Sequence, residues 1–267
     1  MDPYELMIKT NRHLIRGGRL SGPQRANIVR QMLAARSTTE QARRFWRGVK
    51  FPGNMDGEGR RMYPAYFIPP YNGGKKLQTV IPLSPKTHIL SANAYELEIV
   101  RLLYLLAPDR PEVREIAEGT IARLRSTCFG YRGCAVGECF ESALVTLRFL
   151  AAAAPGETEW VRTLIALFYD HVGDNKRRHG NVLWYFWLCL SELPAEIALP
   201  EISRHEEQIL RQLRQSPVMN SEQDQEHHPV MICVIRNAMA RLPEYAYLKD
   251  RQHYMSEKDG RLHFDLT

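Results

Sequence analysis

Four aliphatic segments that each end at a proline constrain the fold of this 267-residue chain more than any other feature. Each segment has the pattern of a buried helix, and proline cannot continue a helix, so the chain must turn at that point. The prolines stand 47, 39 and 49 residues apart, and a second helical pattern follows each of the first three. This alternation is typical of stacked helical pairs. The segments end at Pro108, Pro155, Pro194 and Pro243.

The pattern predicts an all-α fold, either an irregular HEAT- or armadillo-like array of helical repeats or a non-repetitive helical bundle. In an array, the apolar stripe of each helical pair is too wide to be covered alone, so neighbouring pairs stack into one core. An arginine precedes three of the four prolines by seven residues, at Arg101, Arg148 and Arg236, and Trp187 replaces it before Pro194. We expect this helical body to span residues 91–243.

Residues 1–50 are predicted to form short basic helices. Ser21 is expected to cap one of them, with Pro23 in its first turn, and Thr38 or Thr39 is expected to cap the next. Two basic helices joined by a short turn also fit a helix-turn-helix reader of DNA, although the joint between them contains no glycine.

The segment 51–90 contains six prolines and five glycines, so no helix runs through it. Its five aromatic residues need a surface to pack on. It is therefore either a structural strap across the helices or a lid that holds a ligand. The tail, residues 244–267, ends in alternating apolar residues that predict a small β-hairpin or strand, which we expect to pair with extended pieces within 62–81. All four regions are expected to form one compact domain.

The net charge of +6 is unevenly distributed along the chain. Residues 1–86 contain 16 Lys and Arg against 5 Asp and Glu, which gives +11, and residues 87–267 contain 20 against 25, which gives −5. Basic surfaces attract acidic protein faces and nucleic acids. The basic and acidic parts can also bind each other within one chain or between two copies, so a homo-oligomer is an alternative.

The leading hypothesis is a binding or scaffold protein that grips an anionic macromolecule, either an acidic protein or a nucleic acid. Its basic N-terminal helices and its aromatic strap would supply the contacts. Affinity should then fall as ionic strength rises. The predicted partner-binding residues are Arg43, Arg44, Trp46, Arg47, Tyr63, Tyr66 and Tyr71.

The runner-up is an enzyme on an all-helical frame that uses the loop from Cys128 to Cys139 as a metal or thiol site. Three thiols, Cys128, Cys134 and Cys139, stand within twelve residues of a glycine-containing loop, and His171 or His179 would supply a fourth ligand for zinc or iron. Their spacing matches no common zinc or iron–sulfur motif, so inert buried cysteines are the plainer interpretation and no cofactor is predicted outright.

Other polar clusters have equally plain interpretations. Residues 225–229 contain two adjacent histidines, His227 and His228, which are expected on a loop before a helix. The basic turn at 176–181 precedes a helix and would suit an anion. The acidic residues of the helix starts at 95–98 and 138–141 either stabilise those starts or converge as a catalytic pair. No phosphate-binding loop, zinc-protease motif or nucleophile elbow occurs.

The N-terminal residues lack the positive charge and apolar core of a signal peptide, and the five cysteines do not suggest an exported disulfide framework. The longest apolar run, residues 182–190, is shorter than the roughly 18 residues of a membrane-spanning helix. We therefore expect a cytoplasmic protein with reduced thiols and no membrane partner.

Overall fold

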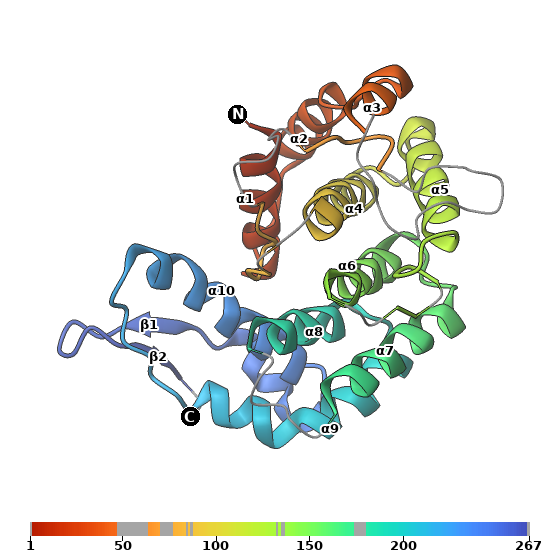
Figure 1. Cartoon of the computed structure of the whole chain (residues 1–267). Coiled ribbons are helices and arrows are strands. Elements are labelled where there is room, and N and C mark those ends of the chain that lie inside the picture. Colours follow the sequence, from red (N-terminus) through yellow and green to blue (C-terminus); the bar gives the residue numbers. More distant parts are fainter. Residues whose placement is uncertain are drawn as a thin grey trace.

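The computed structural model is mostly helical, with 68% of the chain in helices and a two-stranded antiparallel sheet near its C-terminal end, so the predicted all-α fold is confirmed (Figure 1). It describes residues 2–46, 64–69, 77–83, 85, 88–131, 133–134, 137–173 and 180–265. None of the described helices is long and apolar enough to cross a membrane.

The first three helices begin at side-chain caps, as the basic N-terminal sequence predicts. They are α1 (Pro3–Ile15), α2 (Gly22–Ala34) and α3 (Thr39–Phe45). The Asp2 carboxylate accepts from the Tyr4 backbone N–H at 2.9 Å, and Ser21 and Thr38 each form a capping box with the glutamine three residues later. The predicted caps at Ser21 and Thr38 are therefore confirmed, because each satisfies backbone donors that a helix start leaves free.

The body consists of an inner row and an outer row of helices. The inner row is α4 (His88–Leu106), α6 (Glu138–Ala153), α8 (Gly180–Glu192) and α10 (Glu222–Met239), and each of these packs on the next. The outer row is α5 (Pro111–Arg125), α7 (Thr158–Val172) and α9 (Ala195–Leu213), and each of these packs on inner helices beside it. The four inner helices are the segments that precede the four prolines, so the proline turns separate the rows (Figure 1).

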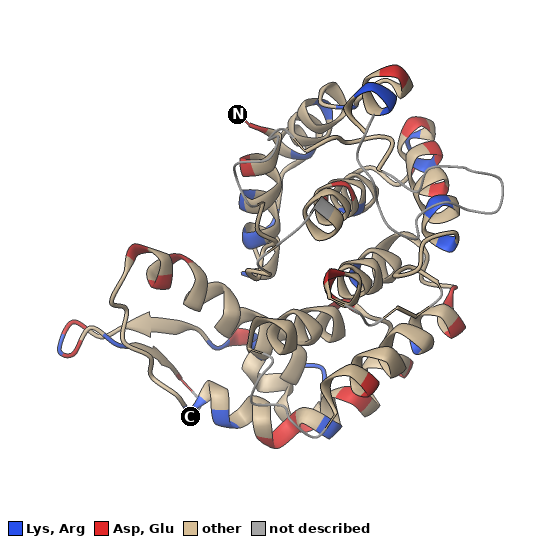
Figure 2. Ribbon diagram, viewed as in Figure 1, with Lys and Arg blue, Asp and Glu red and all other residues tan. Residues whose placement is uncertain are grey.

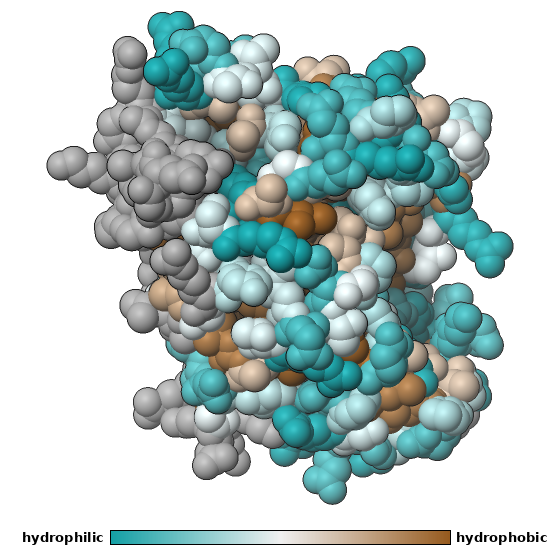
Figure 3. Space-filling view, turned by 90° about the vertical axis from the view of Figure 1, so that its right-hand side faces the viewer, coloured by the Kyte–Doolittle hydropathy of each residue, from teal (hydrophilic) through white to brown (hydrophobic). Residues whose placement is uncertain are grey.

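The two rows differ in how much of their surface is buried. Most residues of α6 and α8 are buried, whereas the outer helices bury one stripe and expose the remainder. Figure 3 shows the side of the molecule that lies on the right in Figure 1, where hydrophilic residues predominate and apolar ones lie in small separate areas. One apolar core runs from Leu6 to Phe264 and includes side chains of α1, of the inner and outer rows and of the C-terminal strands.

The described part of the strap packs on the helices, as a structural strap would. Glu96 of α4 accepts from the backbone N–H groups of Tyr66 and Phe67 at 2.8 and 3.1 Å. The Trp46 indole donates to the Pro64 carbonyl at 3.0 Å, and the Ser37 N–H donates to the Tyr66 carbonyl at 2.8 Å. These bonds attach residues 64–69 to the end of α2, to α3 and to α4.

The C-terminal hairpin is confirmed, but the described residues within 62–81 do not pair with it. Strand β1 (His253–Met255) pairs antiparallel with β2 (Leu262–Phe264), after the 3-10 helix η2 (Pro243–Asp250). Among the described residues, the further bridge joins Arg261 to Val218 rather than to the strap. The hairpin lies beside the residues between α9 and α10, and its side chains Leu262 and Phe264 join the main core there.

The expectation of a loop at residues 225–229 is also wrong. Ser221 caps α10 and exchanges hydrogen bonds with Asp224, so the helix begins at Glu222 and continues through Pro229. The capping box outweighs the proline, which removes only one backbone donor from an otherwise well-started helix. Both histidines therefore project from a helix.

Candidate anion-binding cleft

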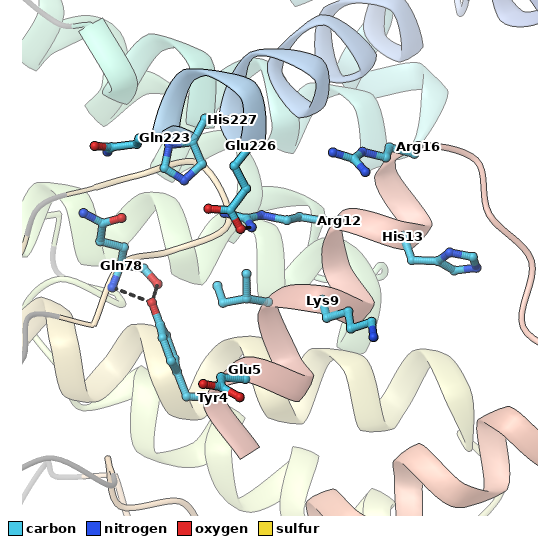
Figure 4. Close-up of a pocket in the computed structure, with 11 residues that line it drawn as sticks. Tyr4, Glu5, Lys9, Arg12, His13, Arg16, Gln78, Gln223, Glu226 and His227 are labelled. Carbon is cyan, nitrogen blue, oxygen red and sulfur yellow. Dashed lines mark hydrogen bonds and ion pairs between the residues drawn. The ribbon is translucent and has the colours of Figure 1, made fainter. Parts of the chain in front are cut away.

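A cleft of about 1000 Å³ separates the first helix from the start of the last long helix (Figure 4). One face of α1 forms the first wall, since its lining residues recur every four positions in two adjacent rows. The opposite wall comes from the first two turns of α10, and Gln78 of the strap closes one end. The lining residues are Tyr4, Glu5, Ile8, Lys9, Arg12, His13, Arg16, Gln78, Gln223, Glu226 and His227.

The end of the cleft at Gln78 is fixed by Tyr4. Its hydroxyl donates to the Gln78 carbonyl at 3.0 Å and lies at the same distance from the Gln78 backbone N–H, which donates back to it. Burial raises the pKa of Tyr4 above its usual value, so the hydroxyl stays neutral. This contact attaches the strap to α1 and keeps the Tyr4 ring against the wall (Figure 4).

Arg12 and Glu226 point towards each other across the cleft and form an ion pair (Figure 4). The Arg12 side chain is 15% exposed and Glu226 is 57% exposed. The buried Nε of Arg12 has no hydrogen-bond acceptor among the described residues. Arg12 lines the cleft, so the exposed part of its side chain can meet a ligand carboxylate or phosphate.

The other two cations of this wall, Lys9 and Arg16, make fewer polar contacts with the described residues than Arg12 does. In the part of the chain that the structure describes, neither Lys9 nor Arg16 forms an ion pair or a side-chain hydrogen bond. Figure 2 shows basic residues on α1 and acidic residues at the start of α10. Burial lowers the pKa of His227 below the ordinary histidine value and nearby Arg12 lowers it further, so this ring is mostly neutral at pH 7.

A second set of charges lies at the centre of the molecule and is fully paired. The Arg148 side chain of α6 is 1% exposed and donates to Glu98 at 2.7 and 2.8 Å and to Glu192 at 2.9 and 3.0 Å. Arg101 donates to Glu192 at 2.5 Å, and both arginines bond Asn11 of α1 at 3.1 Å. We call these residues, with Tyr185, whose hydroxyl donates to Glu98 at 2.6 Å, the buried ion network.

The buried ion network explains two of the three arginines found before the prolines. Arg101 and Arg148 occupy equivalent positions on neighbouring inner helices, and this is why both reach Glu192. Arg236 of α10 instead bonds Asn237 and the Arg251 carbonyl. Burial alone would lower the pKa of Arg148, but Glu192 and Glu98 raise it well above its usual value.

Three of the acidic residues at the helix starts, Glu96, Glu98 and Glu138, contact different groups. Glu98 belongs to the buried ion network, while Glu96 binds the strap and pairs with Arg123 at 3.0 Å. Glu138 accepts from the Leu90 backbone N–H at 3.2 Å. Each carboxylate therefore serves a different contact.

The three loop cysteines do converge. The sulfur atoms of Cys128, Cys134 and Cys139 all lie within 4.8 Å of one another, and those of Cys128 and Cys139 are 3.7 Å apart. Each of the three thiols is free and half-buried. His171, expected as a fourth ligand, lies outside this group and stacks on Phe140 with ring centroids 3.8 Å apart. His179 lies outside the described residues.

The predicted partner-binding residues divide into three groups. Arg43 and Arg44 are exposed on α3. Trp46 is 2% exposed and packs with Ala42 and Ala92, and the half-buried Tyr66 packs against Gly119 and under Arg36. The remaining three, Arg47, Tyr63 and Tyr71, lie outside the described residues.

The cleft was not among the sites predicted from the sequence. One sequence feature does indicate the wall on α1. Tyr4, Ile8, Arg12 and Arg16 stand four residues apart within the basic N-terminal stretch. That spacing defines a helix face but does not say which distant element lies opposite.

No protein-family model, curated protein or solved structure matches this chain.

Proposed function

We propose that this chain is a binding protein built on repeating helix pairs, and that an acidic segment of a partner protein binds in the cleft between α1 and α10. The observation that carries the proposal is the row of cations on the α1 wall. Lys9, Arg12 and Arg16 line one cavity of about 1000 Å³, large enough for several residues of an extended peptide.

Electrostatics supports an anionic occupant. Two of the three cations lack an ion-pair partner among the described residues, and the buried Nε of Arg12 lacks an acceptor. A ligand carboxylate can pair with Lys9 and Arg16, whose charges have no ion-pair partner in the described part of the chain. The uneven charge of the whole chain would steer an acidic partner to this end of the molecule.

Two features favour an acidic protein segment over a nucleic acid. Glu5 and Glu226 lie among the cations, which suits spaced carboxylates better than a continuous row of phosphates. Single-stranded nucleic acids also need open aromatic rings on which bases can stack. Trp46 is 2% exposed, and the half-buried Tyr66 ring is covered by Arg36.

Further parts of the proposal concern the surroundings of the cleft. Arg43 and Arg44, which are exposed on α3, are proposed as secondary contacts for a longer partner. The expected cellular location is the cytoplasm. Self-association through the basic N-terminal and acidic C-terminal parts is the alternative to a separate partner, and sedimentation at low salt distinguishes a monomer from a dimer.

The convergence of the three loop cysteines favours a second candidate function, an enzyme on the same frame. Its first requirement is a metal ion or a reactive thiol at residues 128–139. The cleft proposal does not depend on it.

The test is fluorescence anisotropy with a labelled peptide rich in Asp and Glu, compared with DNA and RNA oligonucleotides of equal charge. We expect the peptide to bind more tightly and its affinity to fall as salt rises. Replacing two cleft cations together, Lys9→Gln and Arg16→Gln, should weaken peptide binding about tenfold, equivalent to about 1.4 kcal/mol.

A matched control removes the same charge from the outer row. Arg211→Gln with Arg214→Gln on α9, where both side chains are exposed, should leave peptide affinity unchanged. Equal loss in both double variants would mean that net charge alone drives binding and would contradict the cleft. If an oligonucleotide binds more tightly than the peptide, the partner of the cleft is a nucleic acid and not an acidic protein.

A further inference from the structure

The loop between α5 and α6 gathers three of the five cysteines at one point. Cys128 follows the end of α5, Cys139 is the second residue of α6, and Cys134 lies between them. Their sulfur atoms lie within 4.8 Å of one another although eleven residues separate the first from the last. The half-buried position of all three leaves the group accessible from solvent.

Backbone contacts hold this loop in its folded shape. The Cys134 N–H donates to the Cys128 carbonyl at 3.0 Å, which closes the loop on itself. The Gly130 N–H donates to the Thr127 hydroxyl at 2.9 Å, and the Trp160 indole donates to the Gly130 carbonyl. The cysteines are therefore positioned by contacts that do not involve their own side chains.

Glycines are required where the loop turns most sharply. A Cβ at Gly130 would lie 2.3 Å from the Leu124 carbonyl oxygen, so no larger residue fits there. Gly133 and Gly137 have φ values of 68° and 55°, a region that other residues adopt at a cost. Both flank the segment that brings Cys134 and Cys139 to Cys128.

One sulfur–sulfur distance matches the coordination shell of a single metal ion, and the third sulfur lies within 4.8 Å of the other two. Zinc–thiolate bonds of about 2.3 Å in a tetrahedral site place the sulfurs about 3.8 Å apart. The observed separation between Cys128 and Cys139 is 3.7 Å. In an iron–sulfur cluster the cysteines bind different iron atoms, which spreads their sulfurs further apart than a single ion does.

The charge state of the group also suits a cation. The Cys128 and Cys139 sulfur atoms are in direct contact at 3.7 Å. Two thiolates this close repel each other. A divalent cation removes that repulsion, and its binding releases the protons of the thiols that are still protonated.

We propose that Cys128, Cys134 and Cys139 bind one zinc ion through three thiolate sulfurs, leaving its fourth position to water or an external ligand. Three sulfur donors this close together favour zinc over magnesium or calcium, which prefer oxygen. No other His, Cys, Asp or Glu of the described ranges has a donor atom in this group. Three protein ligands with an open position are typical of zinc sites that bind substrates, and the inference is independent of the cleft.

The experiment uses the full-length protein, purified with a reductant, stripped with a chelator and titrated with Zn²⁺ and with Co²⁺. We expect one ion per chain, thiolate-to-cobalt charge-transfer bands, and loss of those bands when zinc is added. Zinc should also protect three of the five thiols from a thiol reagent in the native state. Binding of less than one ion per chain, or cobalt spectra without thiolate bands, would overturn the site.

Single variants assign the ligands. Cys128→Ser, Cys134→Ser and Cys139→Ser should each weaken zinc binding by about 100-fold or more, since even the loss of a supporting contact costs 10–100-fold. Cys189→Ser is the control, because Cys189 is buried in α8 and donates to the Leu144 carbonyl at 3.5 Å. Unchanged zinc affinity in all three loop variants would contradict the proposal. Circular dichroism checks folding, and the wild-type cobalt spectrum decides the matter if a variant does not fold.

Discussion

The buried ion network and the cleft contain the same kinds of residue, but their charges differ in pairing and in exposure to solvent. Both contain arginines and glutamates, and a residue of α1 contributes to each, Asn11 to the network and Arg12 to the cleft. In the network every charge is paired, and Arg148 and Glu98 are each only 1% exposed. In the cleft one ion pair is half open to solvent and neighbouring cations have no partner among the described residues.

The difference teaches that access to water, rather than residue type, separates structural charges from binding charges. Pairing a buried charge offsets a large desolvation penalty, so removing one member leaves the others uncompensated. An exposed pair is screened and contributes little to stability, but its charges remain available to a ligand. Substitutions in the network should therefore change the free energy of unfolding, whereas substitutions in the cleft should change the affinity for a ligand.

The largest expected effect comes from Arg148→Met, which removes the central cation of the network. Glu98 and Glu192 would face each other without it, and we expect the free energy of unfolding to fall by about 3–5 kcal/mol. Urea unfolding followed by circular dichroism measures the loss. The control is Arg114→Met, whose exposed pair with Asp109 should contribute no more than about 1 kcal/mol. Equal midpoints for the two variants would mean that the network is not structural.

The second effect is acid destabilisation through Glu192. Burial alone would raise the pKa of Glu192, but Arg101 and Arg148 hold it below its usual value. A lowered pKa means that the stabilisation is complete above the unfolded-state pKa of about 4.3 and is lost as pH falls through the lower folded-state value. In a series from pH 7 to pH 3, the Glu192 contribution to stability should be constant until the pH approaches about 4.3 and should decline below that value. The Glu192→Gln variant should have a lower free energy of unfolding at pH 7 and should lose less of it as the pH falls. An equal loss in the variant and the wild type would mean that other carboxylates cause the acid destabilisation.

The smallest expected effect is on the cleft. Glu226→Gln removes the carboxylate that pairs with Arg12, so Arg12 becomes fully available to an anionic peptide. We expect affinity for the acidic peptide to rise about threefold while the free energy of unfolding changes by less than about 1 kcal/mol. Anisotropy and urea unfolding on the same sample measure both quantities. Weaker peptide binding would show that Glu226 assists the ligand rather than competing with it.

Local features of the fold could be predicted from the sequence. Proline ends a helix and a serine or threonine begins one through contacts within four residues, so the ends at Pro108 and Pro155 and the starts after Ser21 and Thr38 were visible. The same local reasoning failed at residues 225–229, where two adjacent histidines were expected on a loop. The capping box at Ser221 begins the helix at Glu222, seven residues before Pro229, and one missing donor does not end it.

The candidate sites could be predicted only in part from the sequence. The three cysteines stand close together in the sequence, so a local loop could bring them together, but their spacing alone did not show that the sulfurs would meet. The cleft was missed because its two walls, α1 and the start of α10, are about 210 residues apart in the chain.

The sequence by itself determined an all-helical chain with capped basic helices at one end, proline turns between helix pairs and uneven charge. These properties depend on backbone geometry and on neighbours within one or two turns of helix. Only the tertiary structure decided which charges are buried and which are open. Arg148 and Arg12 are both helical arginines, but Arg148 lies between inner helices that exclude water, and Arg12 lies where α1 and α10 leave a gap. Desolvation and pairing act through space, and for these two residues the decisive partners lie as far as 137 and 214 positions away.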